Sequence, residues 1–358
     1  MQQSLRQLIE NCRCIAIIGM EKNTGKTTVL NRILSAKPAL DSVAVTSIGF
    51  DGEEIDRVTG TNKPVIFVGR GTLVATAGSL LACCDTTREI LACTGIHTAL
   101  GEVVVFRALS DGYIRLAGPS ITSQMKDLVD ILRALGAKKV FIDGAAARKS
   151  SAAIDAADAC ILATGGALSP SIEEVANQTA FSAKLLTLPE TSLPPKVLAE
   201  FEAVAQNGFD QWSESPENLC IALHEDSDPI ILGSSLDDST IDRAADNSVN
   251  CWLFFKGLLS CRFAELFLQK TRMLTGLKIV AGNGTNFFLR LEQFNEFMRR
   301  GASFEVLHSG KLKAITINPT SPAGWSLDSA KLKQKLKQLT SVPVYDVISD
   351  DIQENLHE

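Results

Sequence analysis

The sequence lacks several features that would assign it to a specialised class of protein. It has no apolar run of membrane-spanning length. It has no block of lysine and arginine, and its formal net charge is −6, so nothing in it resembles the basic surface of a nucleic-acid-binding protein. Its first fourteen residues lack the charged-then-apolar layout of a signal peptide. We therefore expect a cytoplasmic protein that acts without nucleic acid or a membrane.

The cysteines give little indication of a metal site or of disulfides. There are nine, an odd number, and most lie within apolar segments, where a thiol behaves as a small hydrophobic group. The closest pairs are Cys12 with Cys14 and Cys83 with Cys84. Neither pair has zinc-site spacing, and no histidine is near. We expect the cysteines to be reduced.

The length of 358 residues favours two domains, because single hydrophobic cores rarely grow so large. The best boundary is a stretch from Leu186 to Pro195 that contains three prolines. We therefore predict a nucleotide-binding domain over residues 1–188, a linker with a short helix over 189–217, and a second, smaller α/β domain over 218–358 that could bind a partner.

The most informative stretch lies near the start of the chain. Four apolar residues, Ile15 to Ile18, predict a buried strand, and the Gly-containing run Gly19 to Gly25 leads into the helical pattern Lys26 to Leu34. A strand, a Gly-rich turn and a helix that begins with Lys-Thr-Thr are typical of a phosphate-binding P-loop. The predicted nucleotide-binding residues are Lys22, Asn23, Thr24, Gly25, Lys26, Thr27 and Thr28.

Each residue type in this stretch has a physical role in phosphate binding. The first backbone N–H groups of a helix have no acceptor within it, and the helix dipole adds about +0.5 charge there, so an anion is favoured. Gly25 lets the backbone approach the phosphate, Lys26 supplies a compact positive charge, and the Thr27 hydroxyl is expected to hold Mg²⁺. One departure from the usual pattern is that five residues, rather than four, separate Gly19 from Gly25.

Two acidic positions are candidate partners of this loop. Asp51 follows a predicted strand, with Glu53 and Asp56 close behind, and Asp143 ends another. Ligands of open α/β sheets lie beyond the carboxyl ends of the strands, so Asp51 and Asp143 are predicted as catalytic residues with Lys26, and as Mg²⁺ ligands with Thr27. A solvated acidic loop around Asp51 is the alternative.

Alternating strands and helices predict an α/β fold with a doubly wound, mostly parallel sheet in the first domain. Within it we expect a helix from Leu73 to Cys93. A hairpin from Gly101 to Gly118 is expected around a Ser-Asp-Gly turn. In the second domain, the loop from Asn318 to Trp325 follows a strand and could contact a substrate or partner, or be a structural proline turn.

Two resemblances extend these predictions. The motif Gly19 to Thr27, together with Ile142-Asp143-Gly144-Ala145, is similar to the P-loop branch that includes dethiobiotin synthetase. That family has the longer loop spacing, and the likeness implies Thr27 and Asp143 as Mg²⁺ ligands. Ala146 and Ala147 stand where the ligase carries a further glycine after its acid, which weakens an interpretation of this chain as the ligase itself.

A second resemblance extends over most of the chain. It is carried by the motifs Gly19–Thr28, Leu116–Ser120, Asp143–Ala145 with Arg148–Ser150, Ile161–Gly165 and Asn318–Pro322. These resemble the smaller reactivase subunit that accompanies adenosylcobalamin-dependent lysine 5,6-aminomutase. The likeness implies an ATP-driven helper that works with a larger MutS-like ATPase and exchanges damaged cobalamin in the mutase.

Taken together, the sequence predicts an ATP- and Mg²⁺-binding P-loop protein that hydrolyses ATP and serves as a reactivase component. Two alternatives stay open. One is an ATP-dependent small-molecule ligase or kinase of the dethiobiotin synthetase type, and the other is a non-catalytic nucleotide-binding module. The absence of an Asn-Lys-x-Asp motif favours ATP over GTP only mildly.

Overall fold

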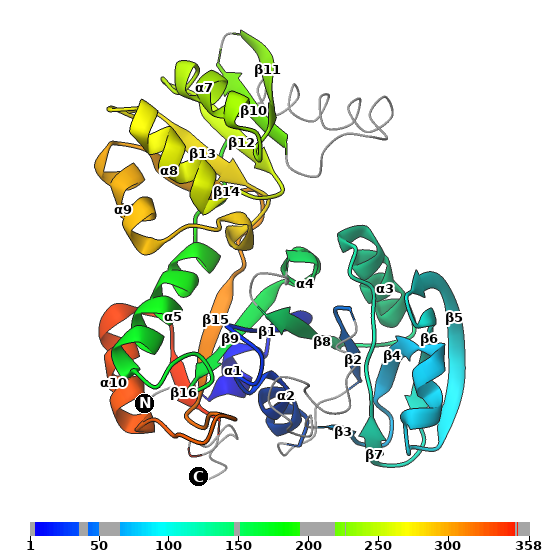
Figure 1. The fold of residues 1–358 in the computed structure, drawn as a ribbon. Helices are drawn as coiled ribbons and strands as arrows, with labels where there is room; N and C mark the ends of the chain where they lie inside the picture. Colours follow the sequence, from blue (N-terminus) through cyan, green and yellow to red (C-terminus); the bar gives the residue numbers. More distant parts are fainter. Residues whose placement is uncertain are drawn as a thin grey trace. The chain divides into compact units, whose positions relative to one another are not determined.

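The structure is a computed structural model of the chain, and it describes residues 4–35, 42–49, 65–146, 151–193, 219–225, 227–347 and 349. The chain divides into two compact units, residues 1–184 with 310–358, and residues 185–309. The protein is α/β: the first unit contains a large, mostly parallel sheet, and the second unit contains a smaller sheet of its own (Figure 1).

The larger sheet has the strand order β16-β15-β9-β1-β8-β2-β4-β6-β5. The pairs from β16 to β4 are parallel, and β6 and β5 add an antiparallel edge. Their bounds are β1 Cys14–Gly19, β2 Val43–Ser47, β4 Leu73–Ala77, β5 Arg88–Thr98, β6 Gly101–Ala108, β8 Lys139–Ala146, β9 Ala159–Gly165, β15 Leu312–Asn318 and β16 Val344–Asp346. Every residue of β1, β2 and β9 is buried, as expected of parallel strands that are covered on both faces.

Helices lie on both faces of this sheet. Figure 1 shows α1 (Leu5–Leu8) and α2 (Lys26–Ser35) on one face, and α3 (Thr122–Ala134) and α4 (Ser151–Ala156) on the other. Helix α2 buries Val29, Leu30 and Ile33, which belong to the same core cluster as β1 residues Ile15 and Ile17. This packing fixes the start of α2 beside the carboxyl end of β1.

Two predicted elements of the first unit are wrong. The expected helix from Leu73 to Cys93 is instead strand β4, a short 3₁₀ helix at Gly78–Cys83 and most of strand β5. The expected hairpin does not form as one ribbon, because β6 pairs with β4 and β5, whereas β7 (Gly112–Ile114) pairs with β3 (Ile66–Val68).

The division into units also differs from the predicted domains. Residues 310–358, expected in the second domain, group with the first unit, and the boundary after residue 184 falls at the end of α5 (Ile172–Leu186). Strand β15 pairs with β9 on one side and β16 on the other, and α10 (Ser329–Leu339) connects β15 to β16. Because β15 is apolar, it gains most by burial within a sheet. The second unit is therefore an insertion between α5 and β15.

In its described residues, the second unit has a sheet of order β11-β10-β12-β13-β14 that is packed against helices. Its strands are β10 Leu219–His224, β11 Ser227–Ser234, β12 Trp252–Lys256, β13 Lys278–Ala281 and β14 Ser303–Val306, and its helices include α7 Asp238–Asp246, α8 Cys261–Lys270 and α9 Leu291–Arg299. The aromatic rings of Phe255, Phe263, Phe267, Phe297 and Phe304 pack in sequence between the sheet and the helices. The second unit thus has a core of its own.

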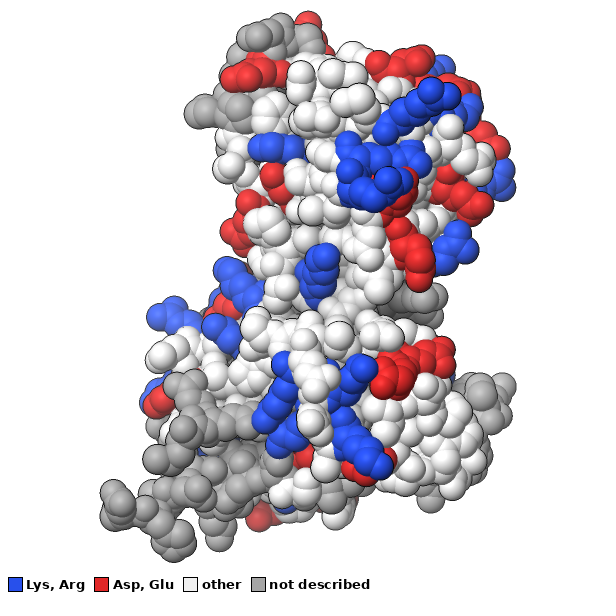
Figure 2. Space-filling view, turned by 90° about the vertical axis from the view of Figure 1, so that its left-hand side faces the viewer, with Lys and Arg blue, Asp and Glu red and all other residues white. Residues whose placement is uncertain are grey.

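Among the described residues, no helix combines the length and apolar character needed to cross a bilayer. On the face that Figure 2 shows, lysine and arginine side chains occur in small groups, with acidic side chains between them. That face therefore presents charges of both signs.

Candidate functional site

Several predicted site residues meet at one edge of the large sheet. The carboxyl ends of its parallel strands lie together, so Gly19 of β1, Ser47 of β2 and Gly165 of β9 mark the same edge. The strand register places Asp143 of β8 opposite both Ile17 and Ser47. In open α/β sheets this edge is where ligands bind.

The loop between β1 and α2 has the backbone shape of an anion-binding turn. Asn23 and Gly25 have positive φ angles of 61° and 92°, and one residue with negative φ separates them. Such alternation turns successive N–H groups toward one side and forms a concave nest for an anion. The amide of Val29 donates to the Gly25 carbonyl at 2.9 Å, so the helical hydrogen bonding starts at Gly25. The N–H groups of the first turn therefore add to the nest.

The loop folds over Gly19. A Cβ built on Gly19 would lie 2.6 Å from Oγ1 of Thr24 and 2.8 Å from Nζ of Lys26. Both of these side chains donate to the Glu21 carbonyl, at 2.9 Å and 3.1 Å. A methyl group at position 19 would therefore require the Thr24 and Lys26 side chains to move.

The predicted loop residues differ in their exposure. Thr24 is buried and Lys22 is exposed, whereas Asn23 and the residues from Gly25 to Thr28 are partly exposed. The Thr24 side chain therefore stabilises the fold of the loop, whereas Lys26, Thr27 and Thr28 are accessible to a ligand. Their binding of nucleotide stays a prediction.

Asp143 lies on the face of the sheet that α2 covers. Alternate residues of a strand share a face, and Phe141, two residues before Asp143, belongs to the core cluster that includes Val29 and Leu30 of α2. The residue is partly exposed, its Oδ1 is buried, and its carbonyl accepts from the Ile48 amide at 3.0 Å. Asp51, Glu53 and Asp56 lie outside the described residues.

The side chains at this edge suit a hard divalent cation. Thr27 offers a hydroxyl oxygen and Asp143 a carboxylate, and Mg²⁺ is usually held by one or two such groups together with substrate phosphates and water. Within the described ranges, no cluster of three or more histidine, cysteine, aspartate or glutamate side chains could hold a metal ion.

A second turn clamps the end of β2 at the same edge. A Cβ on Gly118 would lie 1.9 Å from the Ser47 carbonyl oxygen. The Gly118 amide donates to the Gly49 carbonyl at 3.1 Å, and the Gly49 amide donates to the Pro119 carbonyl at 3.4 Å. The sequence alone indicated no role for this turn at the site, although a Gly-Pro pair is typical of a turn.

The Asn318–Trp325 loop forms the side of the site opposite β8. A Cβ on Gly25 would lie 3.0 Å from the Cβ of Asn318. The Gly166 amide donates to the Asn318 carbonyl at 2.9 Å, and the Trp325 indole donates to the Gly166 carbonyl at 2.9 Å. The sequence placed this loop in the second domain, as either a contact loop or a structural proline turn, whereas it lies in the first unit beside Gly25.

Comparison of the chain with known protein families, with curated proteins and with solved structures gives no match. The chemistry of the site must therefore follow from its own residues.

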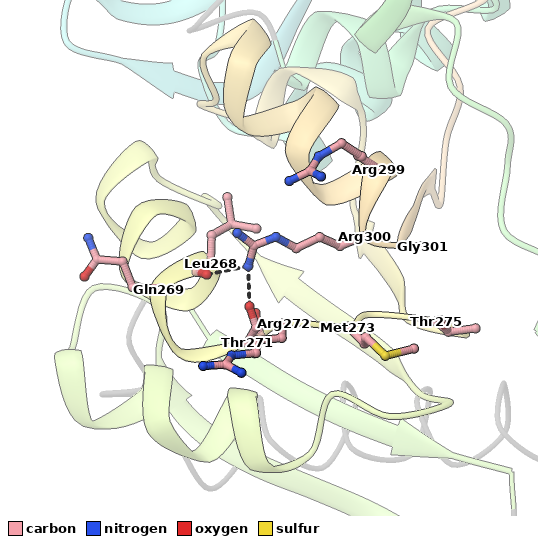
Figure 3. A pocket seen from close by; sticks show the side chains of 9 residues that line it. All are labelled: Leu268, Gln269, Thr271, Arg272, Met273, Thr275, Arg299, Arg300 and Gly301. Carbon is pink, nitrogen blue, oxygen red and sulfur yellow. Dashed lines mark hydrogen bonds between the residues drawn. The ribbon is translucent and has the colours of Figure 1, made fainter.

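A cavity of about 800 Å³ lies in the second unit, between the ends of α8 and α9 (Figure 3). It is lined by Leu268, Gln269, Thr271, Arg272, Met273, Thr275, Arg299, Arg300 and Gly301. Arg300 donates to the carbonyls of Leu268 and Thr271 at the end of α8, and its Nε donates to Glu296 at 2.6 Å. The guanidinium thus satisfies carbonyls that a helix end leaves open, and none of the predicted site residues lines this cavity.

Proposed function

We propose that the chain binds a Mg²⁺-nucleoside triphosphate, with ATP as the first choice, in the loop from Gly19 to Thr28, and hydrolyses it. The observation that carries the proposal is the shape of that loop. It follows a buried strand, has positive φ angles at Asn23 and Gly25, and passes directly into α2. A strand, a turn of this shape and a helix are typical of a phosphate-binding P-loop, and this likeness supports the proposal.

In this proposal Lys26 changes partner when nucleotide binds. Its ammonium group donates to the Glu21 carbonyl and lies above Gly19, within the curve of the loop. A phosphate oxygen in the nest replaces that carbonyl as the acceptor, and a charged hydrogen bond replaces one to a neutral group. This change of partner favours phosphate binding, because the loop backbone is already folded around the position of the phosphate and little conformational entropy is lost.

Thr27 and Asp143 are the proposed Mg²⁺ ligands, with Asp51 as a third. When bound, the cation neutralises charge that develops on the phosphates. Asp143 is held in place by strand pairing on both sides, with β1 and with β2. Lys26, Asp51 and Asp143 are the proposed catalytic residues, which act by positioning and by electrostatic stabilisation.

Titration calorimetry with Mg·ATP tests the proposal. The wild-type chain should bind, and Lys26→Ala should weaken binding by at least tenfold, because the charged partner of the phosphates is lost. Lys126→Ala is the matched control, since Lys126 is an exposed lysine on α3 of the same unit. Equal affinity of the wild-type and Lys26→Ala chains would contradict the proposal.

We further propose that ATP hydrolysis serves reactivation of an adenosylcobalamin-dependent lysine aminomutase, together with a larger MutS-like ATPase. This part is supported by the sequence resemblance alone. A mutase inactivated by damaged cobalamin should regain activity only when the chain, the larger ATPase and ATP are all present. ATP consumption by the chain alone on small carboxylates would instead favour a ligase or kinase, and tight binding without turnover would favour a non-catalytic module.

A further inference from the structure

The side chain of Trp325 is anchored in the loop that follows β15, and this loop begins beside Gly25. Its indole N–H donates to the Gly166 carbonyl at 2.9 Å, and its own carbonyl accepts from the Ser321 amide at 2.9 Å. The residue nevertheless remains 37% exposed. Because its N–H group already has a partner, the exposed part of Trp325 can offer apolar surface to a ligand without leaving a polar group unpaired.

The loop that carries Trp325 is closed by its own backbone. The Leu327 amide donates to the Pro319 carbonyl at 3.0 Å, and Thr320 pairs with Ser326 as an isolated bridge. Gly324, with a φ of 96°, makes the turn between the two halves. An aromatic ring on so constrained a loop loses little conformational entropy when a ligand stacks on it.

This loop adjoins the phosphate-binding turn. Asn318, at the start of the loop, packs against Gly25, and Gly166, which holds the indole, bonds to the Asn318 carbonyl. The residues from Asn318 to Trp325 include no charged side chain. A neutral wall ending in an aromatic ring suits the uncharged part of a nucleotide rather than its phosphates.

We infer that Trp325 is the stacking surface for the base of the bound nucleotide. This inference rests on the proposed function, because the phosphates must lie in the loop from Gly19 to Thr28 for the base to reach the indole. It assigns the C-terminal loop of the first unit a role in binding affinity. Stacking tolerates any base that presents a π face, so the contact sets affinity without selecting between adenine and guanine.

Binding of Mg·ATP and of Mg·tripolyphosphate, which has no base, separates this role from phosphate binding. Trp325→Ala should weaken ATP binding roughly 5- to 100-fold and leave tripolyphosphate binding unchanged. Trp325→Phe should restore most of the ATP affinity, since a smaller ring still stacks. Tyr113→Ala is the control, because Tyr113 is an aromatic residue of the same unit that is 48% exposed on β7.

Tryptophan emission gives a second readout. ATP should change the emission of the wild-type chain, tripolyphosphate should change it less, and Trp325→Phe should remove the difference. Equal losses of ATP and tripolyphosphate binding in Trp325→Ala would overturn the inference, since the residue would then only hold the loop. Unchanged ATP binding in that variant would also overturn it. If the wild-type chain binds neither ligand, the proposed function itself has failed.

Discussion

Gly25 and Asn318 are in contact, although 293 positions separate them in the sequence. A Cβ built on Gly25 would lie 3.0 Å from the Cβ of Asn318. The candidate site is therefore built from both ends of the first unit, and the second unit is inserted between them. The loop that follows β15, near the C-terminal end of the first unit, lies beside the loop that follows β1.

Gly25→Ala tests whether this contact matters for nucleotide binding. Alanine at a φ of 92° costs roughly 1–2 kcal/mol, and its methyl group would press on Asn318. We expect nucleotide affinity to fall at least tenfold, measured by calorimetry. Gly71→Ala is the matched control, because Gly71 has a φ of 94° and a methyl group added there would have no atom within 4 Å. Both variants should lose stability, Gly25→Ala at least as much as Gly71→Ala because of the added contact with Asn318. A similar loss of affinity in both would contradict the proposed role of the contact.

Gly19→Ala tests whether the close packing of the loop on Gly19 matters for binding. Gly19 does not have a positive φ angle, so alanine can adopt its backbone conformation. The added methyl group would meet Oγ1 of Thr24 at 2.6 Å and Nζ of Lys26 at 2.8 Å, so the lysine must move. We expect weaker binding of Mg·ATP by tenfold or more in an equilibrium titration. Gly69→Ala, where the nearest atom would be 3.7 Å away, should bind as the wild type does. Full binding by Gly19→Ala would show that the close packing of Thr24 and Lys26 on Gly19 is not needed for phosphate binding.

Asp143→Asn tests the proposed cation ligand. The amide keeps the size of the side chain but removes the charge that attracts Mg²⁺. We expect ATP affinity measured without Mg²⁺ to stay the same or rise, and the gain in affinity on adding Mg²⁺ to disappear. Asp130→Asn, at an exposed position of α3, should keep that gain. A Mg²⁺ dependence that survives in Asp143→Asn would remove this residue from the metal site.

Glu296 gives a prediction for the second unit. Hydrogen bonds from Arg299 and Arg300 lower the pKa of its carboxyl from 4.5 to about 2. Because the folded pKa is the lower one, the stabilisation is complete above pH 4.5 and is lost as the pH falls toward 2. Glu296→Gln should therefore lower the melting temperature at neutral pH, and the difference from wild type should shrink as the pH falls below 4.5. A difference that stays constant throughout this acidic range would contradict the assignment.

Local patterns sufficed for the elements around the candidate site. The apolar run before Gly19 and the helical pattern after Lys26 predicted β1 and α2, and the run ending at Asp143 predicted β8. These elements combine strong burial with clear turn residues, so propensity and packing agree. The register of β1 with β8 places Asp143 opposite Ile17, near the end of β1 where the loop to α2 begins, and its role as a Mg²⁺ ligand stays a prediction.

Long-range pairing was beyond the reach of local patterns. The segment from Leu73 to Cys93 is rich in alanine and leucine, which favour helix, yet β4 is paired with β2 and β6 and fully buried, and tertiary contacts override such propensity. The Asp-Gly turn before β7 gave no sign that Asp111 accepts from the Arg70 amide at 2.7 Å. The apolar sequence of β15 is compatible with a position in either sheet, so its pairing with β9 in the first unit could not be predicted.

The most direct test of the proposed nucleotide site is a crystal structure of the chain with Mg²⁺ and a non-hydrolysable ATP analogue. We predict the triphosphate within the loop of residues 22–28, with Nζ of Lys26 on phosphate oxygens and the cation beside Thr27 and Asp143. A triphosphate bound anywhere else on the chain would contradict the proposal.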